Sequence, residues 1–252
     1  MSTLNLQNIT TTVNVGTSEE KKILKNINLN LEDGDFVTLL GTNGAGKSTL
    51  LNIINGSLFP TSGKVLLDNQ DITHLSEVKR AKYISQVFQD PKMGTAPRMT
   101  VAENLLLATQ RGQKRRLRLR GLEKHLNELK KETAQLPNGL SDRLNTFVGS
   151  LSGGQRQTLS FLMATIKKPK LLLLDEHTAA LDPNTSHQLL ELTNKTVTQQ
   201  HLTCIMITHQ LKDALKYGNR IIILNNGKIV LDVKNSEKEK LTEDDILQYF
   251  SD

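Results

Sequence analysis

The chain has 252 residues, of which 37% are hydrophobic and 23% charged, and its net charge at pH 7 is +6. A globular chain of this length buries a full core as one large domain or as two lobes. The longest aliphatic runs, 171–174 and 221–224, are far shorter than the roughly 20 residues that span a bilayer. The N-terminus lacks the basic and apolar segments of a secretion signal. We therefore expect any membrane contact to come through a partner.

The single cysteine and the positive charge give weaker indications. Cys204 lies in an apolar run and has no second cysteine to pair with, which favours a reducing compartment. The basic residues are densest at 111–120. This segment is interpreted first as a solvated helix face, with a protein partner or a lipid surface as alternatives. Nucleic acid is disfavoured because no aromatic residue in the segment can stack on a base.

Strand and helix patterns alternate along the chain. An apolar strand at 36–40 runs into a glycine-rich turn, and a helix follows at 48–54. A short strand at 65–67 ends in an Asp-Asn turn. The remaining expected elements are helices at 101–108 and 121–135 and strands at 171–174, 204–207 and 220–231, the last split by a turn at 225–227. This order predicts a helical lobe inserted into an α/β core.

The turn after the first of these strands carries a phosphate-binding pattern. Residues 41–48 fit G-x-x-x-x-G-K-[ST] with Gly41-Thr42-Asn43-Gly44-Ala45-Gly46-Lys47-Ser48. Glycines allow backbone N–H groups to curl around phosphates, and the following helix directs its positive end at the same anion. Lys47 is placed to reach the β- and γ-phosphates, and the Ser48 hydroxyl to hold Mg²⁺. The pattern predicts nucleotide binding.

Two acids follow the strand at 171–174. Asp175 and Glu176 stand at the carboxyl end of a buried strand, where parallel sheets bind ligands. Asp175 is the candidate to hold Mg²⁺ through its water shell, and Glu176 the candidate to polarise the attacking water. Acids after an apolar run are common, but together with the phosphate loop they indicate ATP hydrolysis.

A second anion cradle is predicted at Leu151-Ser152-Gly153-Gly154-Gln155. The Ser152 hydroxyl and the backbone amides at a helix start suit an anion. One chain therefore has one phosphate loop but two phosphate cradles. In this signature, and in the order and spacing of its motifs, the chain resembles the ATPases of ABC transporters from end to end.

The resemblance implies a fold, a site and a dimer. The fold is an α/β P-loop ABC ATPase with a RecA-like core, an antiparallel β subdomain and an inserted helical subdomain. One ABC ATPase domain covers 1–252, with the core and β subdomain at 1–89 and 165–252 and the helical signature subdomain at 90–164. The signature of one subunit covers the γ-phosphate held by the loop of a second copy, so that two ATP lie between two subunits.

Individual residues take the family's roles where they match its motifs. Gln89 matches the glutamine that contacts Mg²⁺ or water and reports to the helical lobe, and 180–182 matches the loop that crosses the dimer interface. His209 matches the histidine that bonds the γ-phosphate and orients Glu176 and its water. The expected catalytic residues are Lys47, Gln89, Glu176 and His209, and the expected Mg²⁺ ligands are Ser48, Gln89 and Asp175. The expected ATP contacts are Gly41, Thr42, Asn43, Gly44, Ala45, Gly46, Lys47, Ser48, Thr49, Val13, Ser152, Gly153, Gly154 and Gln155.

The sequence departs from the family pattern at two places. Val13 stands where relatives carry the aromatic residue that stacks on adenine, with Val15 as the alternative if the alignment shifts. Stacking on an aromatic ring contributes roughly 1–3 kcal/mol, so adenine is expected to be held less tightly. His177 stands where many relatives have proline. It is interpreted first as a structural residue that shapes the loop, with a second titratable group near the site as the alternative.

In the detail of residues 89–97 and 175–183 the chain resembles a bacterial solute-importer subgroup with relatives associated with aromatic amino acids. The implied partners are membrane permease subunits, an extracytoplasmic solute-binding protein and a second copy of the chain. The implied location is the cytoplasmic side of the membrane, peripheral through the permease. The alternatives are an exporter ATPase and, with less support, a soluble ABC ATPase acting on nucleic acid or the ribosome. A small P-loop kinase is disfavoured by the signature. The residues do not identify the solute.

Overall fold

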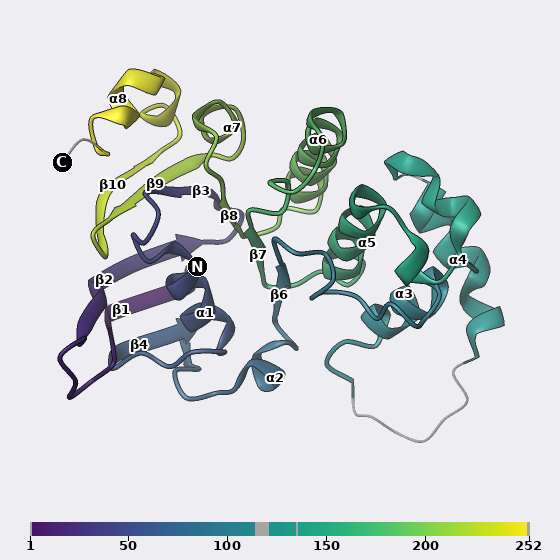
Figure 1. Ribbon diagram of the computed structural model, residues 1–252, viewed down its shortest axis with the longest axis horizontal. Coiled ribbons are helices and arrows are strands. Elements are labelled where there is room, and N and C mark those ends of the chain that lie inside the picture. Colours follow the sequence, from purple (N-terminus) through teal and green to yellow (C-terminus); the bar gives the residue numbers. More distant parts are fainter. Residues whose placement is uncertain (1, 114–120, 135, 251–252) are drawn as a thin grey trace. The chain divides into compact units, whose positions relative to one another are not determined.

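The computed structural model describes residues 2–113, 121–134 and 136–250. They form two compact units (Figure 1): the first holds the described residues of Met1–Arg80 and His201–Asp252, and the second those of Ala81–Gln200. The predicted helical subdomain, 90–164, lies within the second unit, which also contains two strands and a further helix.

The first unit carries eight strands among its described residues, together with short helices. Its strands are β1 (Ser2–Val13), β2 (Lys21–Glu32), β3 (Phe36–Gly41), β4 (Ser62–Leu67), β5 (Gln70–Asp71), β8 (Cys204–Ile207), β9 (Arg220–Asn225) and β10 (Lys228–Lys234). Its helices are α1 (Lys47–Asn55), α2 (Glu77–Arg80), α7 (Leu211–Lys216), the 3-10 helix η3 (Lys238–Lys240) and α8 (Glu243–Leu247).

The second unit is mainly helical. Its strands are β6 (Ile84–Val87) and β7 (Leu171–Asp175). Its helices are α3 (Val101–Thr109), α4 (Leu122–Ala134), α5 (Gly153–Thr165) and α6 (Pro183–Gln199), with the 3-10 helices η1 (Pro137–Arg143) and η2 (Val148–Ser150).

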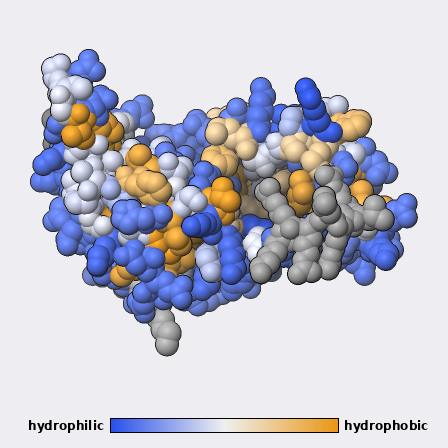
Figure 2. All heavy atoms as spheres, turned by 90° about the horizontal axis from the view of Figure 1, so that it is seen from below, coloured by the Kyte–Doolittle hydropathy of each residue, from blue (hydrophilic) through white to orange (hydrophobic). Residues whose placement is uncertain are grey.

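No helix of the described segments is both long enough and apolar enough to cross a bilayer. The face in Figure 2 is predominantly hydrophilic, and its hydrophobic residues form separate patches. The large hydrophobic side chains that are clearly exposed are Val15, Phe59, Val78, Met93, Leu107, Phe147, Val230 and Leu247.

Two sheet arrangements organise the first unit (Figure 1). One is antiparallel, in the order β2-β1-β4-β5. In the other, β3 lies between β8 and β9 and is parallel to both, while β10 pairs antiparallel with β9. Every residue of β3 is buried, as expected for a parallel strand covered on both faces. The strands predicted at 36–40 and 204–207 are confirmed.

Two predicted turns have the backbone that a tight hairpin requires. Asp68 and Asn69 have φ of 49° and 62°, and Asn226 and Gly227 have φ of 47° and 76°. Two consecutive left-handed residues match the right-handed twist of the flanking strands, and Asn, Asp and Gly adopt them most readily. The turn between β9 and β10 therefore splits the predicted 220–231 strand as expected.

A buried arginine closes the C-terminus of α1. Arg80 is 1% exposed, and its guanidinium donates to the backbone carbonyls of Ile53, Ile54, Thr73 and Leu75 at 2.6–2.8 Å. The last carbonyls of a helix have no partner within it, so the arginine satisfies them and joins α1 to the segment before α2. Burial lowers the pKa of Arg80 to about 10, which leaves it charged at neutral pH.

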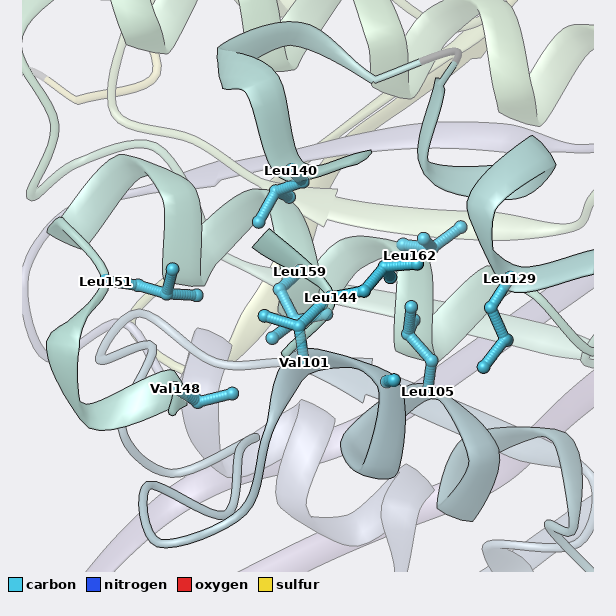
Figure 3. Close-up of a cluster of buried hydrophobic side chains, with 10 residues drawn as sticks. Val101, Leu105, Leu129, Leu140, Leu144, Val148, Leu151, Leu159 and Leu162 are labelled. Atoms are coloured by element: carbon cyan, nitrogen blue, oxygen red, sulfur yellow. The ribbon is translucent and has the colours of Figure 1, made fainter. Parts of the chain in front are cut away.

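The helices of the second unit enclose one hydrophobic cluster (Figure 3). Its members come from α3, α4, α5 and the segments between α4 and α5, and comprise Val101, Ala102, Leu105, Leu129, Leu140, Leu144, Val148, Leu151, Leu159 and Leu162. A capping box between Thr100 and Glu103 starts α3. The helix predicted at 101–108 is confirmed, and that at 121–135 is confirmed as far as 134, since residue 135 lies outside the described residues.

The basic segment at 111–120 is described only in part, and residues 114–120 lie outside the described residues. At Arg111 the interpretation as a solvated helix face is wrong. Its guanidinium donates to Ser85 Oγ and to the carbonyls of Ala164 (3.0 Å) and Lys167, and burial lowers its pKa. The carbonyls at the end of α5 need donors, and Arg111 supplies them.

Replacing Arg80 by methionine tests its contribution to the first unit. The variant leaves four buried or partly buried carbonyls without this donor, and we expect it to lower the free energy of unfolding by about 2–4 kcal/mol. Urea denaturation measures the change. Lys79→Met, at the exposed neighbouring position on α2, is the control and should shift the midpoint little. Equal shifts in the two variants would contradict the role given to Arg80.

Candidate nucleotide site

The predicted phosphate loop connects β3 to α1. Gly44 and Gly46 adopt φ of 81° and 105°, a region that glycine enters without strain. A Cβ on Gly41 would lie 2.3 Å from the Leu224 carbonyl oxygen on β9, so only glycine fits there. The glycines therefore satisfy both the curl of the loop and its contact with the neighbouring strand.

Lys47 holds its charge at the centre of the loop. It is 6% exposed, and its Nζ donates to the carbonyls of Gly41 at 2.7 Å and Thr42 at 3.0 Å. Ser48 is exposed in the first turn of α1. The Gly227 N–H donates to the Ala45 carbonyl at 3.1 Å, so the turn between β9 and β10 supports the loop from outside.

His209 stands at the same edge of the sheet as the loop. In the parallel pair of β3 and β8, Leu39 is opposite Ile207, so Gly41 and His209 each follow two residues later. His209 is exposed. The sheet register therefore places this predicted residue and the phosphate loop at neighbouring strand ends.

The adenine end of the predicted site carries no aromatic ring at either candidate position. Val13 is half-buried at the end of β1, opposite Lys21 on β2. Val15 is 67% exposed, in the connection between these strands.

In the second unit, Gln89 and the two acids lie at the carboxyl ends of paired strands. The strands β6 and β7 are parallel, with Val87 opposite Leu174. Gln89 and Glu176 therefore each follow two residues later at one edge, beside Asp175. Gln89 is exposed, while Asp175 and Glu176 are partly buried.

The backbone at Glu176 is in an uncommon conformation. Its φ is 46°, a left-handed value that a residue with a long side chain seldom adopts. The Glu176 carbonyl accepts from the Ala179 N–H at 3.0 Å, so a tight turn follows the strand. Strain of this kind marks positions whose orientation matters.

His177 points into the second unit. It is 2% exposed, its Nε2 lies 3.1 Å from Thr193 Oγ1 on α6, and its ring stacks on Phe161 of α5 at 6.4 Å between ring centres. Burial lowers its pKa to about 4, so the imidazole is neutral at physiological pH. These contacts support the structural interpretation of His177.

The signature residues form the first turn of α5. Ser152 is the N-cap and exchanges hydrogen bonds of 3.2 Å with Gln155, its Oγ accepting from the Gln155 N–H and its own N–H donating to Gln155 Oε1. Gln155 Nε2 also donates to the Asn138 carbonyl at 3.1 Å. A Cβ on Gly154 would lie 2.5 Å from Thr185 Cγ2, whereas one on Gly153 would meet nothing within 4 Å.

A groove of about 400 Å³ adjoins this turn. It lies where α5 and α6 both begin, and its lining consists of Asn138, Ser152, Gly153, Gly154, Gln155, Ala180, Leu181, Asp182 and Thr185. Asp182 caps α6 by accepting from the Thr185 N–H at 3.1 Å, and hydrogen bonds from the Thr185 side chain and backbone lower the pKa of its carboxyl. The N-terminus of α5, with its partial positive charge, suits an anion in this groove, whereas the Asp182 carboxylate already occupies the N-terminus of α6.

The predicted residues thus form two groups. The first unit holds Val13, the loop at 41–49 and His209, and the second holds Gln89, Asp175, Glu176 and the signature. Sequence reasoning missed Asn138 and Thr185 at the groove. The Asn138-Gly139 pair, with φ of 74° and 64°, is a turn signal in the sequence, but Thr185 carries none.

Comparison with known proteins decides the family. The model of the family described as ABC transporter matches residues 24–179, from β2 through the phosphate loop and the signature to the turn after Glu176. The chain belongs to the ABC transporter family. The predicted fold class is confirmed, and the chain is an ATP-binding transport ATPase.

The relatives of this chain include proteins named for transport. The chain is 49% identical over 236 residues to the tyrosine transport ATP-binding protein of Clostridioides difficile (strain R20291), covering 92% of each chain. It is 37% identical over 254 residues to the methionine import ATP-binding protein MetN 2 of Listeria innocua, covering 95% of this chain and 70% of that protein.

Solved cassettes have the same fold. A dimeric ATP-binding cassette in a post-hydrolysis state, bound to ADP and Pi, matches with a TM-score of 0.76 and 32% identity, covering 92% of this chain and 98% of that one. A nucleotide-free cassette matches with a TM-score of 0.78 and 27% identity over 100% of both chains.

The close approach of Gly154 to α6 is testable. Gly154→Ala places a methyl group against Thr185 Cγ2, and we expect it to lower the free energy of unfolding by about 1–3 kcal/mol. Adding Thr185→Ser removes Cγ2 and should restore most of the loss. Gly153→Ala, without a neighbour to meet, is the control for stability by thermal unfolding. A Gly154→Ala defect that Thr185→Ser does not reduce would contradict this packing.

The buried His177 predicts a pH dependence of stability. Its pKa of about 4 is below the value near 6.5 of an unfolded chain. Protonation therefore favours unfolding, and stability is lost as pH falls from 6.5 towards 4. Between pH 7.5 and 5 the contribution is about 2 kcal/mol.

The wild type should accordingly lose about 2 kcal/mol more between these pH values than His177→Gln, which keeps a polar group beside Thr193 but does not titrate. Urea denaturation at several pH values measures this, with His187→Gln on the exposed face of α6 as the control. Parallel curves for wild type and His177→Gln would show that His177 is not a buried neutral imidazole.

Proposed function

We propose that this ATPase drives a bacterial solute importer as a head-to-tail dimer that closes on two ATP. The observation that carries the proposal is the presence of two anion cradles in one chain, the loop at 41–48 in one unit and the Ser152 groove in the other. Each cradle offers the first turn of a helix to an anion. A chain with one phosphate loop uses both cradles when a second copy supplies the signature.

The residues of the loop fit a nucleotide with Mg²⁺. Lys47 is held beside the loop's carbonyls, where it is placed to shift to the β- and γ-phosphates. No group of three His, Cys, Asp or Glu side chains in the described segments is placed to hold a metal alone. A Mg²⁺ bound together with the nucleotide would instead take the Ser48 hydroxyl, the Asp175 carboxylate and the Gln89 amide oxygen as its protein ligands. Bound there, Mg²⁺ would neutralise charge on the phosphates.

Hydrolysis is assigned to residues at the carboxyl ends of strands: His209 after β8, and Gln89 and Glu176 after β6 and β7. Glu176 accepts the proton of the attacking water, and its unusual backbone turn directs the side chain while His177 anchors the next position in the interior. His209 bonds the γ-phosphate and orients this water. Gln89 would contact a bound Mg²⁺ or the water and report to the helical part of its unit.

The permease is proposed to bind beside the Gln89 loop. Met93 and Phe147, at 69% and 58% exposure, are two of the three large apolar side chains exposed among the described residues of this unit. The segment after Phe147 is hydrogen-bonded to the end of the loop, through Gly149 N–H to the Pro97 carbonyl at 2.9 Å. An apolar segment of the permease is proposed to pack against Met93 and Phe147. The permease would hold the chain at the cytoplasmic side of the membrane.

The solute is proposed to be an amino acid, delivered by an extracytoplasmic binding protein. The support is the names of the relatives, which specify tyrosine transport and methionine import. The loop at 41–48 and the signature at 152–155 would bind nucleotide, whereas the permease and the binding protein would select the solute.

Glu176→Gln tests the assigned base together with the dimer. The amide keeps the size of the side chain but cannot accept the proton, so ATP should bind while hydrolysis falls at least about a hundredfold. An ATP-dependent dimer should then accumulate in size-exclusion chromatography. Hydrolysis at the wild-type rate would show that Glu176 is not the base.

Ser152→Arg in the same background separates the two cradles. The bulky side chain fills the Ser152 groove, so the dimer should be lost while each monomer still binds ATP. Ser150→Arg is the matched control, because Ser150 is exposed two residues earlier and does not line the groove. Loss of nucleotide binding in Ser152→Arg alone would contradict a signature that acts on a second copy.

A further inference from the structure

A buried amide joins the signature helix to the loop that carries Gln89. Gln157 lies on α5, two residues beyond Gln155, and is 1% exposed. Its Nε2 donates to the Phe88 carbonyl at 2.9 Å. Phe88 directly precedes Gln89, so the hydrogen bond holds the backbone at the start of this loop.

The oxygen of the Gln157 amide forms no comparable hydrogen bond to a described residue. Gln157 Oε1 is buried and has no hydrogen-bond partner within the described part of the chain. Turning the amide over would place this oxygen against the Phe88 carbonyl, so the donor orientation is the favourable one. A buried acceptor without a partner is unfavourable, and an apolar side chain of similar size would avoid it. Packing alone therefore does not explain the glutamine, whereas its N–H donor does.

A second contact fixes the same loop to the same helix. A Cβ on Gly94 would lie 2.6 Å from Ser160 Oγ and 3.9 Å from Phe88 Cδ2. Gln157 and Ser160 are three positions apart and so share one face of α5. The loop thus rests on this face near both of its ends, at Phe88 and at Gly94.

We propose that Gln157 is a positioning residue that fixes the Gln89 loop to the signature helix, so that the two move as one piece. A displacement of the loop by the permease then shifts the Ser152 cradle, and closure on ATP shifts Gln89. This rests on the roles proposed above for Gln89 and the signature. Gln157 acts through the Phe88 backbone and touches no nucleotide itself.

Gln157→Leu tests the proposal in the purified, full-length protein. The leucine keeps the bulk but loses the donor, so Gln89 is held less accurately when the site forms. We expect kcat for ATP hydrolysis to fall at least about tenfold while KM for ATP stays within about twofold. Because a buried orphan acceptor is removed as well, the melting temperature should change little. A proportional fall of activity and melting temperature, or an unchanged kcat, would overturn the proposal.

Two controls separate this inference from the proposed function. Thr165→Val removes another buried hydrogen-bonding group from α5, one that bonds only within the helix, and should keep the wild-type kcat. Gln89→Ala tests the role of the loop itself. If Gln89→Ala leaves kcat unchanged, the proposed function is wrong at Gln89 and this proposal fails with it. If it lowers kcat and Gln157→Leu does not, only the present proposal fails.

Rescue at the second contact gives an independent result. Gly94→Ala presses a methyl group against Ser160 Oγ and should lower kcat without a matching rise of KM. Adding Ser160→Ala removes the obstructing oxygen and should restore kcat. An unchanged kcat in Gly94→Ala, or a defect that Ser160→Ala does not relieve, would count against the proposed attachment of the loop.

Discussion

Both candidate cradles depend on backbone N–H groups that no side chain blocks. At the start of α1 the open backbone comes from Gly44 and Gly46 in left-handed conformations. At the start of α5 it comes from Gly153 and Gly154, and Gly154 is also required because Thr185 approaches to within a methyl group's space. Such donors at a helix start suit a phosphate. The starts of α1 and α5 therefore determine where the phosphates of a nucleotide would bind.

Strand register supplies the rest of each half. Parallel pairing of β3 with β8 brings His209 to the edge where the phosphate loop begins. In the second unit, parallel pairing of β6 with β7 brings Gln89 and the two acids together at the ends of these two strands. In the turn after β7, two neighbouring residues have different surroundings. Glu176 has the strained backbone conformation, whereas His177 is buried against α5 and α6. The buried contacts of His177 thus hold the backbone in place directly after the proposed base, Glu176.

The elements and the phosphate-binding motifs were predictable because they depend on local order in the sequence. An apolar run before Gly41 or Asp175 marks a buried strand, and the turn at Asn226-Gly227 depends only on its own residues. Contacts between distant segments were not predictable. Arg111 belongs to a run that suggests solvent exposure, yet it turns inward to the end of α5. Thr185 and Gln157 matter through neighbours far along the chain, Gly154 and Phe88, which only the packing reveals.

The central claim, that a complete site needs residues from two copies, is tested most directly by mixing two inactive variants. Lys47→Ala lacks a working phosphate loop but keeps its signature, and Ser152→Arg has the opposite defect. Mixed in equal amounts, they should regain ATP hydrolysis, at up to about a quarter of the wild-type rate, because only a mixed dimer carries an intact site, and it carries one of two. A mixture that stays as inactive as its two components would contradict the account.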